Sequence, residues 1–264
     1  MHSFSSFAQR TMFSGQNNYV APVAPVPLVP TGTNPVTNGL ILYLDATRSA
    51  SYGGTGTTWN DISGQSPANT ATLVGSPTFG SGNLSEGYGS LTFSGTNYAT
   101  TSKSNISLSA ATFIAWVNPS GIQGGLTGII FNRSGNFGST APATGLDFSN
   151  NNAIGYHWND AVSTYTWNSN LQVPVNTWSL IALTITSTSA TAYLYNASAP
   201  LGSSANNSVS HASLNGLNFI IANEPGGPNR SYIGKIGTAM VYSTALSSSD
   251  ITSIFNAQKS AFGL

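Results

Sequence analysis

Charge is what this sequence has least of. Asp, Glu, Lys and Arg make up 5% of its 264 residues, and the seven basic and seven acidic residues cancel. Average globular chains carry about 25% charged residues. Without an excess of positive charge, no electrostatic field is available to hold a phosphate backbone or an anionic membrane surface. We therefore expect neither nucleic acid nor a membrane among the partners of this protein.

Cysteine and long apolar runs are also absent. The chain contains no cysteine, which excludes a disulfide framework and a thiolate metal site. No apolar run approaches the ~20 residues of a membrane-spanning helix. Residues 1–16 carry one arginine and lack the apolar segment of roughly 7–15 residues that a secretory signal peptide needs. We therefore predict no signal peptide.

Ser, Thr and Asn supply the polar surface instead, at more than a third of the chain. Near-zero net charge favours self-association over colloidal repulsion between molecules. This composition indicates a protein that works in an assembly or a matrix. A β protein that merely has few charges is the alternative interpretation.

The first 38 residues differ in composition from the rest. Their centre alternates proline with small apolar residues: Pro22, Val23, Pro25, Val26, Pro27, Leu28, Val29 and Pro30. Proline fixes φ and pushes the preceding residue to extended geometry, which predicts a semi-rigid strut. The strut is either a linker or an arm that docks on a neighbouring subunit, and its valines favour the arm. We predict an arm over 1–38 and one domain over 39–264.

From Gly39 onward, short apolar segments separated by Gly, Asn, Ser and Pro predict an all-β fold. The segment 112–117 is apolar on both faces, so we expect an interior strand there. Thr186–Ser189 predicts a hairpin turn between two strands. The expected strands are 40–44, 91–93, 112–117, 178–185, 191–195, 219–221 and 233–242.

One helix is predicted, near the C-terminus. Ser247 can cap it with Asp250 at the third position, and Ile251, Ile254 and Phe255 fall on one face. We expect this helix to lie on the outside of the β fold.

Eight segments of the chain form a recognisable series: 39–46 (GLILYLDA), 59–64 (WNDISG), 89–95 (GSLTFSG), 112–117 (TFIAWV), 156–159 (YHWN), 178–182 (WSLIA), 233–237 (IGKIG) and 242–247 (YSTALS). In this order they resemble laminin-G-like and concanavalin-A-like jelly-roll domains over about residues 39–264. The resemblance implies a two-sheet antiparallel jelly-roll sandwich with a short C-terminal helix. It also implies a carbohydrate- or protein-binding module, of the kind found in extracellular proteins and in viral and phage particles.

Catalysis is not predicted. Glycoside hydrolysis needs two carboxylates about 5–10 Å apart. Concanavalin-A-like glucanases, which this sequence resembles in fold, place both close together on one strand. No two carboxylates of this chain lie within a dozen residues of each other, although a pair assembled from distant strands stays open. The chain also lacks a Gly-x-Ser-x-Gly elbow, a zinc motif and a P-loop. The carboxylates are Asp45, Asp61, Glu86, Asp147, Asp160, Glu224 and Asp250.

No cofactor or metal is predicted either. Asn150, Asn151, Asn152, Asn159 and Asp160 are loop residues of the kind that bind calcium. Each group offers one carboxylate or none, whereas a hard cation generally takes more. Calcium therefore stays open without a clear ligand set, and we favour amides that hydrogen-bond turn backbones.

One segment concentrates residue types that bind sugars, which present C–H patches to aromatic rings and hydroxyls to amides and carboxylates. We predict a ligand site there. A packing role is the alternative, because Tyr156 and Trp158 share one face of a strand. The predicted site residues are Tyr156, His157, Trp158, Asn159, Asp160, Tyr165 and Trp167.

These observations predict a non-catalytic structural protein of a virus particle, part of a capsid, tail or fibre, located in the virion. Its partners would be other virion proteins or copies of itself, contacted through the arm, with glycans as a further class. The alternative is a carbohydrate-binding or adhesion module of an exported bacterial protein, located outside the cell or at its surface.

Overall fold

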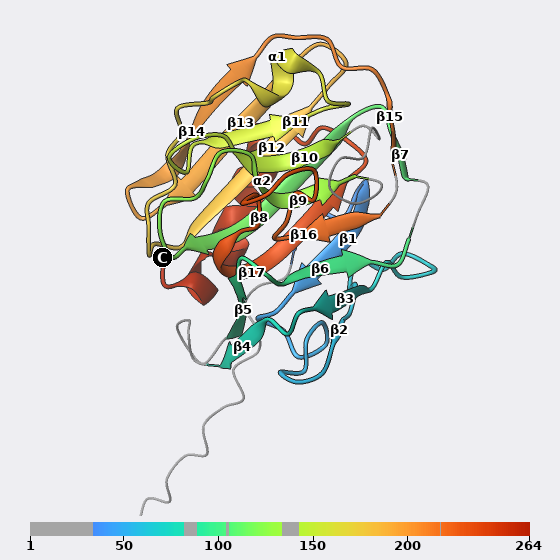
Figure 1. The fold of residues 1–264 in the computed structure, drawn as a ribbon, viewed down its shortest axis with the longest axis vertical. Coiled ribbons are helices and arrows are strands. Elements are labelled where there is room, and N and C mark those ends of the chain that lie inside the picture. Colours follow the sequence, from blue (N-terminus) through green and yellow to red (C-terminus); the bar gives the residue numbers. More distant parts are fainter. Residues whose placement is uncertain (1–33, 82–88, 104–105, 134–142, 217) are drawn as a thin grey trace, which may run out of the picture.

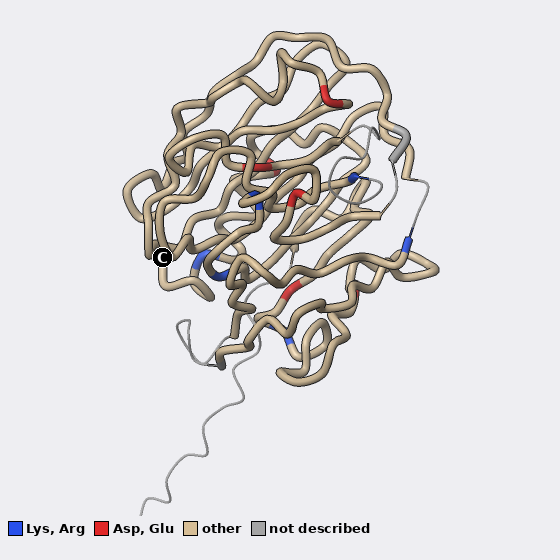
Figure 2. Tube along the Cα trace, viewed as in Figure 1, with Lys and Arg blue, Asp and Glu red and all other residues tan. Residues whose placement is uncertain are grey.

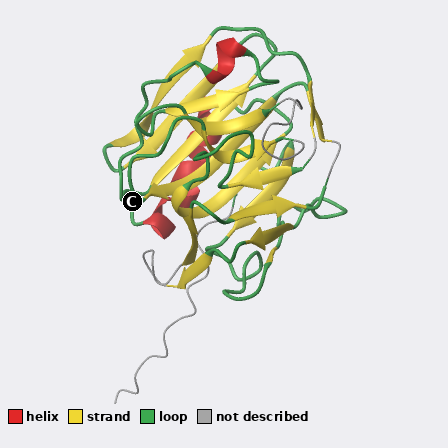
Figure 3. Cartoon of the chain, viewed as in Figure 1, coloured by secondary structure: helices red, strands yellow, loops and turns green. Residues whose placement is uncertain are grey.

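The computed structural model describes residues 34–81, 89–103, 106–133, 143–216 and 218–264 (Figure 1). The predicted docking segment 22–30 lies outside the described residues. Strands dominate the described chain, and its helices are few and short (Figure 3). None of the described helices is long and apolar enough to span a bilayer.

Two antiparallel sheets form a sandwich, as the sequence predicts. The first sheet runs in the order β14-β13-β12-β8-β17-β5-β4, and β1 pairs with β17 beside this path. Its strands are β1 (Leu40–Asp45), β4 (Thr78–Ser81), β5 (Gly89–Ser94), β8 (Ala111–Pro119), β12 (Ser179–Ile185), β13 (Ala190–Asn196), β14 (Ala199–Asn207) and β17 (Ile233–Tyr242).

The second sheet runs in the order β11-β10-β9-β16-β6-β3-β2, and a separate pair of short strands, β7 and β15, completes the strand content of the described residues. These strands are β2 (Thr58–Trp59), β3 (Ala71–Val74), β6 (Tyr98–Thr101), β7 (Ile106–Leu108), β9 (Thr127–Asn132), β10 (Thr144–Phe148), β11 (Ile154–His157), β15 (Leu214–Gly216) and β16 (Phe219–Ile221). The expected strands are therefore confirmed in place and type.

Strand β8 lies inside the first sheet, between β12 and β17. Phe113, Ala115 and Val117 point into the core between the sheets. Ile114 and Trp116 alternate with them and point to the opposite face. The prediction of an interior strand that is apolar on both faces is confirmed.

The C-terminal helix covers that opposite face. Helix α2 (Ser248–Gln258) begins with the predicted capping box between Ser247 and Asp250, and a 3-10 helix, η2 (Lys259–Phe262), follows it. The ring of Trp116 stacks on Phe262, with centroids 4.1 Å apart. Its indole N–H donates to Oε1 of Gln258 over 2.8 Å, so the one buried polar group of this ring is satisfied.

The end of the predicted arm already contacts the domain. The Asn34 side-chain amide donates to the Tyr242 hydroxyl over 2.7 Å, and that hydroxyl donates to the Val36 carbonyl over 3.1 Å. Residues 34–38 therefore lie against the helix side of the sandwich.

The buried residues between the first sheet and α2 form a second hydrophobic core, and Phe255 lies in it. A substitution of Phe255 should therefore lower the stability of the fold. This side chain is 1% exposed and packs on Trp116 and Tyr195. We expect Phe255→Ala to lower the free energy of unfolding by about 3–5 kcal/mol, since it removes a buried ring and leaves a cavity. Urea unfolding measures this loss. The exposed neighbour Asn256, changed to Ala, is the control, and equal losses in both variants would contradict the packing described.

Candidate functional site

Strands β10 and β11 present different residues on their two faces. Leu146, Phe148 and Tyr156 point into the core between the sheets. Asp147 and His157 alternate with them, so their side chains lie on the outer face of the second sheet. They are nevertheless 0% and 2% exposed, because loops cover this part of the sheet.

Glycines in the second sheet allow these loops to pack directly on the strands. A Cβ at Gly128 on β9 would lie 2.5 Å from the backbone nitrogen of Glu224, and a Cβ at Gly155 would lie 2.6 Å from Asp147 Oδ1. Both positions tolerate only glycine without a shift in the backbone or the carboxylate. The loop after β16, residues 222–232, therefore lies directly on β9, where Gly128 N–H donates to the Arg230 carbonyl over 2.9 Å.

This loop carries a carboxylate that is entirely buried. Glu224 is 0% exposed, and its Oε1 lies 2.6 Å from Nε of Arg133. Its Oε2 lies 2.5 Å from Nη1 of Arg230. Arg133 also reaches across to Asp160, with Nη2 3.2 Å from Oδ1. Two arginines and two carboxylates thus form one charge-balanced network.

A second buried pair lies beside the network. Nδ1 of His157 is 2.6 Å from Oδ2 of Asp147, and the imidazole stacks on the ring of Tyr165 with centroids 5.5 Å apart. Burial raises the pKa of the Asp147 carboxyl, and the hydrogen bond with His157 opposes that rise. Oδ1 of Asp147 has no hydrogen-bond partner among the described residues. The pair fixes the imidazole ring in one orientation.

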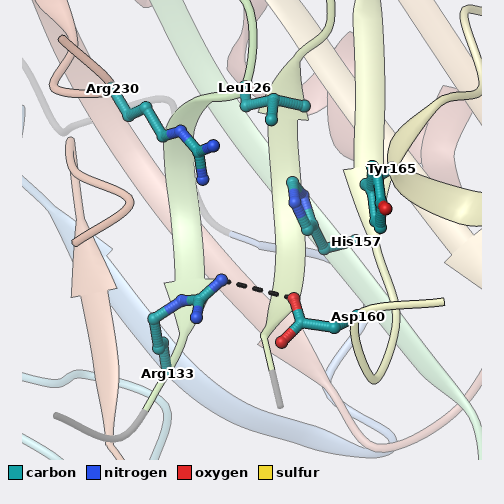
Figure 4. A pocket seen from close by; sticks show the side chains of 6 residues that line it. All are labelled: Leu126, Arg133, His157, Asp160, Tyr165 and Arg230. Carbon is teal, nitrogen blue, oxygen red and sulfur yellow. Dashed lines mark hydrogen bonds and ion pairs between the residues drawn. The ribbon is translucent and has the colours of Figure 1, made fainter. Parts of the chain in front are cut away.

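Together these groups form a pocket of about 360 Å³, which we call the charged pocket (Figure 4). Five of the fourteen charged residues of the chain lie in or beside it, and the other charged residues that the structure describes are scattered over the trace (Figure 2). The five are Arg133, Asp147, Asp160, Glu224 and Arg230. Figure 4 shows Leu126 and Arg230 at one end and Arg133 and Asp160 at the other. Its lining residues are Leu126, Arg133, His157, Asp160, Tyr165 and Arg230.

A sequence profile of the concanavalin A-like lectin/glucanases superfamily matches residues 93–252, more than half of the chain. The chain belongs to this superfamily. The match includes every residue that lines the charged pocket. The resemblance seen in the sequence is thereby confirmed, and the fold is that of a concanavalin A-like domain. A search of curated protein sequences found no significant match.

Solved structures of similar fold include carbohydrate-active proteins. Domain 4 of AbnA, an extracellular arabinanase from Geobacillus stearothermophilus solved with arabinotriose, has a TM-score of 0.54 at 14% identity, covering 81% of this chain and 97% of that one. Trypanosoma rangeli sialidase in complex with sialic acid has a TM-score of 0.56 at 16% identity, and the match covers 89% of this chain and 36% of the sialidase chain. The binding domain of Paraclostridial Mosquitocidal Protein 1 has a TM-score of 0.54 at 14% identity, and the match covers 84% of this chain and 52% of that domain.

This chain thus spans about a third of the sialidase chain and about half of the solved binding domain of the toxin. At these identities the comparisons show a shared fold.

The structure divides the predicted ligand site of the concanavalin A-like domain between two faces. His157, Asp160 and Tyr165 line the charged pocket. Tyr156 and Trp158 are 0% and 1% exposed and belong to the core between the sheets. The alternation of β11 sends Tyr156 inward, and Trp158, the first residue after the strand, packs in the same core, so we correct their assignment from ligand contact to packing.

The other two predicted residues lie outside the lining of the charged pocket. Trp167 packs its ring at an edge-on angle against Tyr156, with centroids 5.6 Å apart. The Asn159 amide lies 3.4 Å from the carbonyl oxygens of Ala212 and Ser213. Both side chains hold the chain around the site and are not part of its wall.

Sequence reasoning missed Leu126, Arg133 and Arg230 of the pocket lining, and the buried Glu224 that pairs with both arginines. They come from segments about ninety residues apart, so no local motif joins them. The one signal in the sequence was the small number of charged residues. A charged group that is buried needs a partner of opposite charge, and this chain offers few candidates.

Among the asparagines considered for calcium, Asn152 hydrogen-bonds to backbone groups. Asn152 is 0% exposed, its Oδ1 accepts from Gln123 N–H over 2.7 Å, and its Nδ2 lies within 3.3 Å of the carbonyls of Gly121 and Val173. Among the described residues, no three His, Cys, Asp or Glu side chains are placed to hold a metal ion.

Glu224 should matter to stability far more than Asp160. Glu224→Gln keeps the shape but leaves two arginines facing a neutral amide, and we expect it to lower the free energy of unfolding by about 3–5 kcal/mol. Asp160 is 37% exposed, so Asp160→Asn should cost less than about 1 kcal/mol. Denaturant unfolding compares the two variants. Similar, small losses would contradict the buried network.

We predict that His211, which hydrogen-bonds to Tyr156 of β11, makes the stability of the protein depend on pH. Nδ1 of His211 must donate to the Thr186 carbonyl, 2.9 Å away, so Nε2 accepts from the Tyr156 hydroxyl at 2.9 Å. This is the neutral form, and burial lowers the pKa of His211. The unfolded chain keeps a pKa of about 6.5. The contribution of His211 to stability is therefore present above that pH and lost as pH falls through the lowered pKa.

We expect the stability difference between wild type and His211→Gln to shrink as pH falls from neutral to below the lowered pKa. Urea unfolding over that range measures it. A difference that stays constant would show that folding leaves the pKa of His211 unshifted, and one that grows toward acid pH would show that the folded protein favours the charged form; either result contradicts the neutral assignment.

Proposed function

We propose that this chain is a non-catalytic carbohydrate-binding module and that the charged pocket holds the sugar. The observation that carries the proposal is the network of Arg133, Glu224, Arg230 and Asp160 at the pocket wall. It gathers a large share of the scarce charges of the chain around one cavity.

Sugar hydroxyls donate and accept hydrogen bonds at the same time, so a site for them needs both kinds of group in fixed positions. Arg133 and Arg230 supply donors, and Asp160 supplies an acceptor. Their ion pairs hold these planar groups before any ligand arrives, which reduces the entropy lost on binding. Tyr165 and Leu126 add apolar wall for the C–H faces of a sugar ring.

Binding is favoured over hydrolysis by the position of the carboxylates. A glycosidase presents two carboxyl groups to its substrate, about 5–10 Å apart. Asp160 is the one carboxylate among the described residues that line the charged pocket. Asp147 and Glu224 are fully buried, held by His157 and the arginines.

The structural neighbours support the same proposal at the level of the fold, since one of them was solved with arabinotriose and another with sialic acid. The sequence alternative, a carbohydrate-binding module of an exported protein, is thus better supported than the virion protein. A virion location stays a prediction, to which the arabinanase, sialidase and toxin structures add no support.

A glycan array followed by isothermal titration calorimetry tests the proposal. We expect binding to at least one oligosaccharide and no release of reducing ends from it. Tyr165→Ala and Asp160→Asn should each weaken that binding by about tenfold or more, or about 1.4 kcal/mol. Val162→Ala is the matched control, because Val162 is 60% exposed on the same helical turn, α1 (Val162–Tyr165), but outside the pocket lining. Absence of glycan binding, or binding unaffected by both pocket variants, would refute the proposal.

A further inference from the structure

A second pocket of about 300 Å³ lies at the loop end of the sandwich. Ile122 and Ile233 frame it, 66% and 48% exposed. Thr96, Asn229 and Ser231 line it between them, and none of its lining residues is charged. Single exposed apolar residues are common on protein surfaces. Here, however, two of the four large apolar residues exposed among the described residues face one cavity.

This uncharged pocket adjoins the charged pocket, because the same two chain segments line both. Leu126 and Arg230 stand at one end of the charged pocket (Figure 4). Gly124, two residues before Leu126, and Asn229 and Ser231, on either side of Arg230, line the uncharged pocket. Two residues of chain span at most about 7 Å, so the two pockets are immediate neighbours.

Two glycines, Gly124 and Gly125, lie at the boundary between the two pockets. Gly124 and Gly125 are exposed and carry no side chain. A Cβ at Gly124 would lie 3.0 Å from the carbonyl oxygen of Asn229, which shows that the two segments touch at this point. At these two glycines no side chain stands between the pockets, and Arg230 lies beside the crossing.

The walls of the uncharged pocket are tied together in advance. The buried side chain of Gln123 donates from Nε2 to the carbonyls of Gly121 and Ile233 over 2.9 and 3.0 Å, and its Oε1 accepts from Ile233 N–H over 2.9 Å. These bonds hold the segments that carry Ile122 and Ile233 at a fixed spacing. A pocket with fixed walls, aliphatic sides, hydroxyls and an amide suits a neutral sugar ring.

We infer that the uncharged pocket is a second subsite for a neutral sugar unit of the same glycan chain whose neighbouring unit occupies the charged pocket. This inference rests on the proposed function, and it adds that the natural ligand is an oligosaccharide that extends past Arg230. The charged pocket anchors one unit, and the uncharged pocket selects for chain length.

The test is calorimetric titration of the full chain with ladders of neutral arabino-, xylo-, gluco- and galacto-oligosaccharides, from the monosaccharide upward. Wild type should gain about tenfold or more in affinity between the shortest member that binds and longer ones. Ile122→Asp puts a charge at an exposed position, where folding tolerates it, and should remove that gain without weakening the shortest ligand. Asp160→Asn should weaken all lengths alike. Leu201→Ala, at an exposed residue of β14 outside both pockets, should change neither.

Affinity independent of length, or a length gain that survives Ile122→Asp, would overturn the second subsite while leaving the charged pocket as a binding site. Failure of every ladder to bind would overturn the second subsite, and failure of every glycan on the array as well would overturn the proposed function.

Discussion

The site depends on one buried carboxylate. Glu224 has no exposure to water, and a charge in that position is tolerated only where opposite charges and hydrogen bonds compensate the lost hydration. Arg133 directly follows β9, and Arg230 comes from the far side of the loop that carries Glu224. Satisfying this one group fixes the loop on the sheet, and Arg133 then draws Asp160 to the opposite wall of the pocket.

The surroundings are built to make this arrangement fit. Without side chains at Gly128 and Gly155, the loop and the Asp147 carboxylate lie against backbone where a Cβ would collide. The low charge of the chain has a second consequence, since few other charged groups compete for the arginines. We therefore interpret the low charge as giving a polar surface with few charged groups around one charge-balanced cavity. Such a cavity offers fixed hydrogen-bonding groups without a net field, which suits neutral hydroxyl-rich ligands better than ions.

The sequence predicted what is local and periodic. The two-faced apolar pattern of 112–117 identified the central strand, and Ser247 with Asp250 identified the helix start, because both signals depend on neighbours in the chain. The site itself was predicted in part. The segment 156–160 was recognised, but its residues alternate between faces, and composition alone did not separate Tyr156 in the core from His157 at the pocket.

Arg133, Glu224 and Arg230 could not be predicted for a different reason. Their proximity results from the pairing of β16 with β9, which brings together segments about ninety residues apart. Such pairing is a property of the folded sheet and leaves no spacing signal in a single sequence.

The central claim is that the arginines paired with Glu224 form the wall that a glycan touches. Nuclear magnetic resonance of the arginine side chains tests it directly, since the chain has four arginines, at positions 10, 48, 133 and 230. On titration with an oligosaccharide that binds, the Nε–H signals of Arg133 and Arg230 should move while that of Arg48 stays fixed. Saturable glycan binding that leaves both Arg133 and Arg230 unmoved would contradict the account.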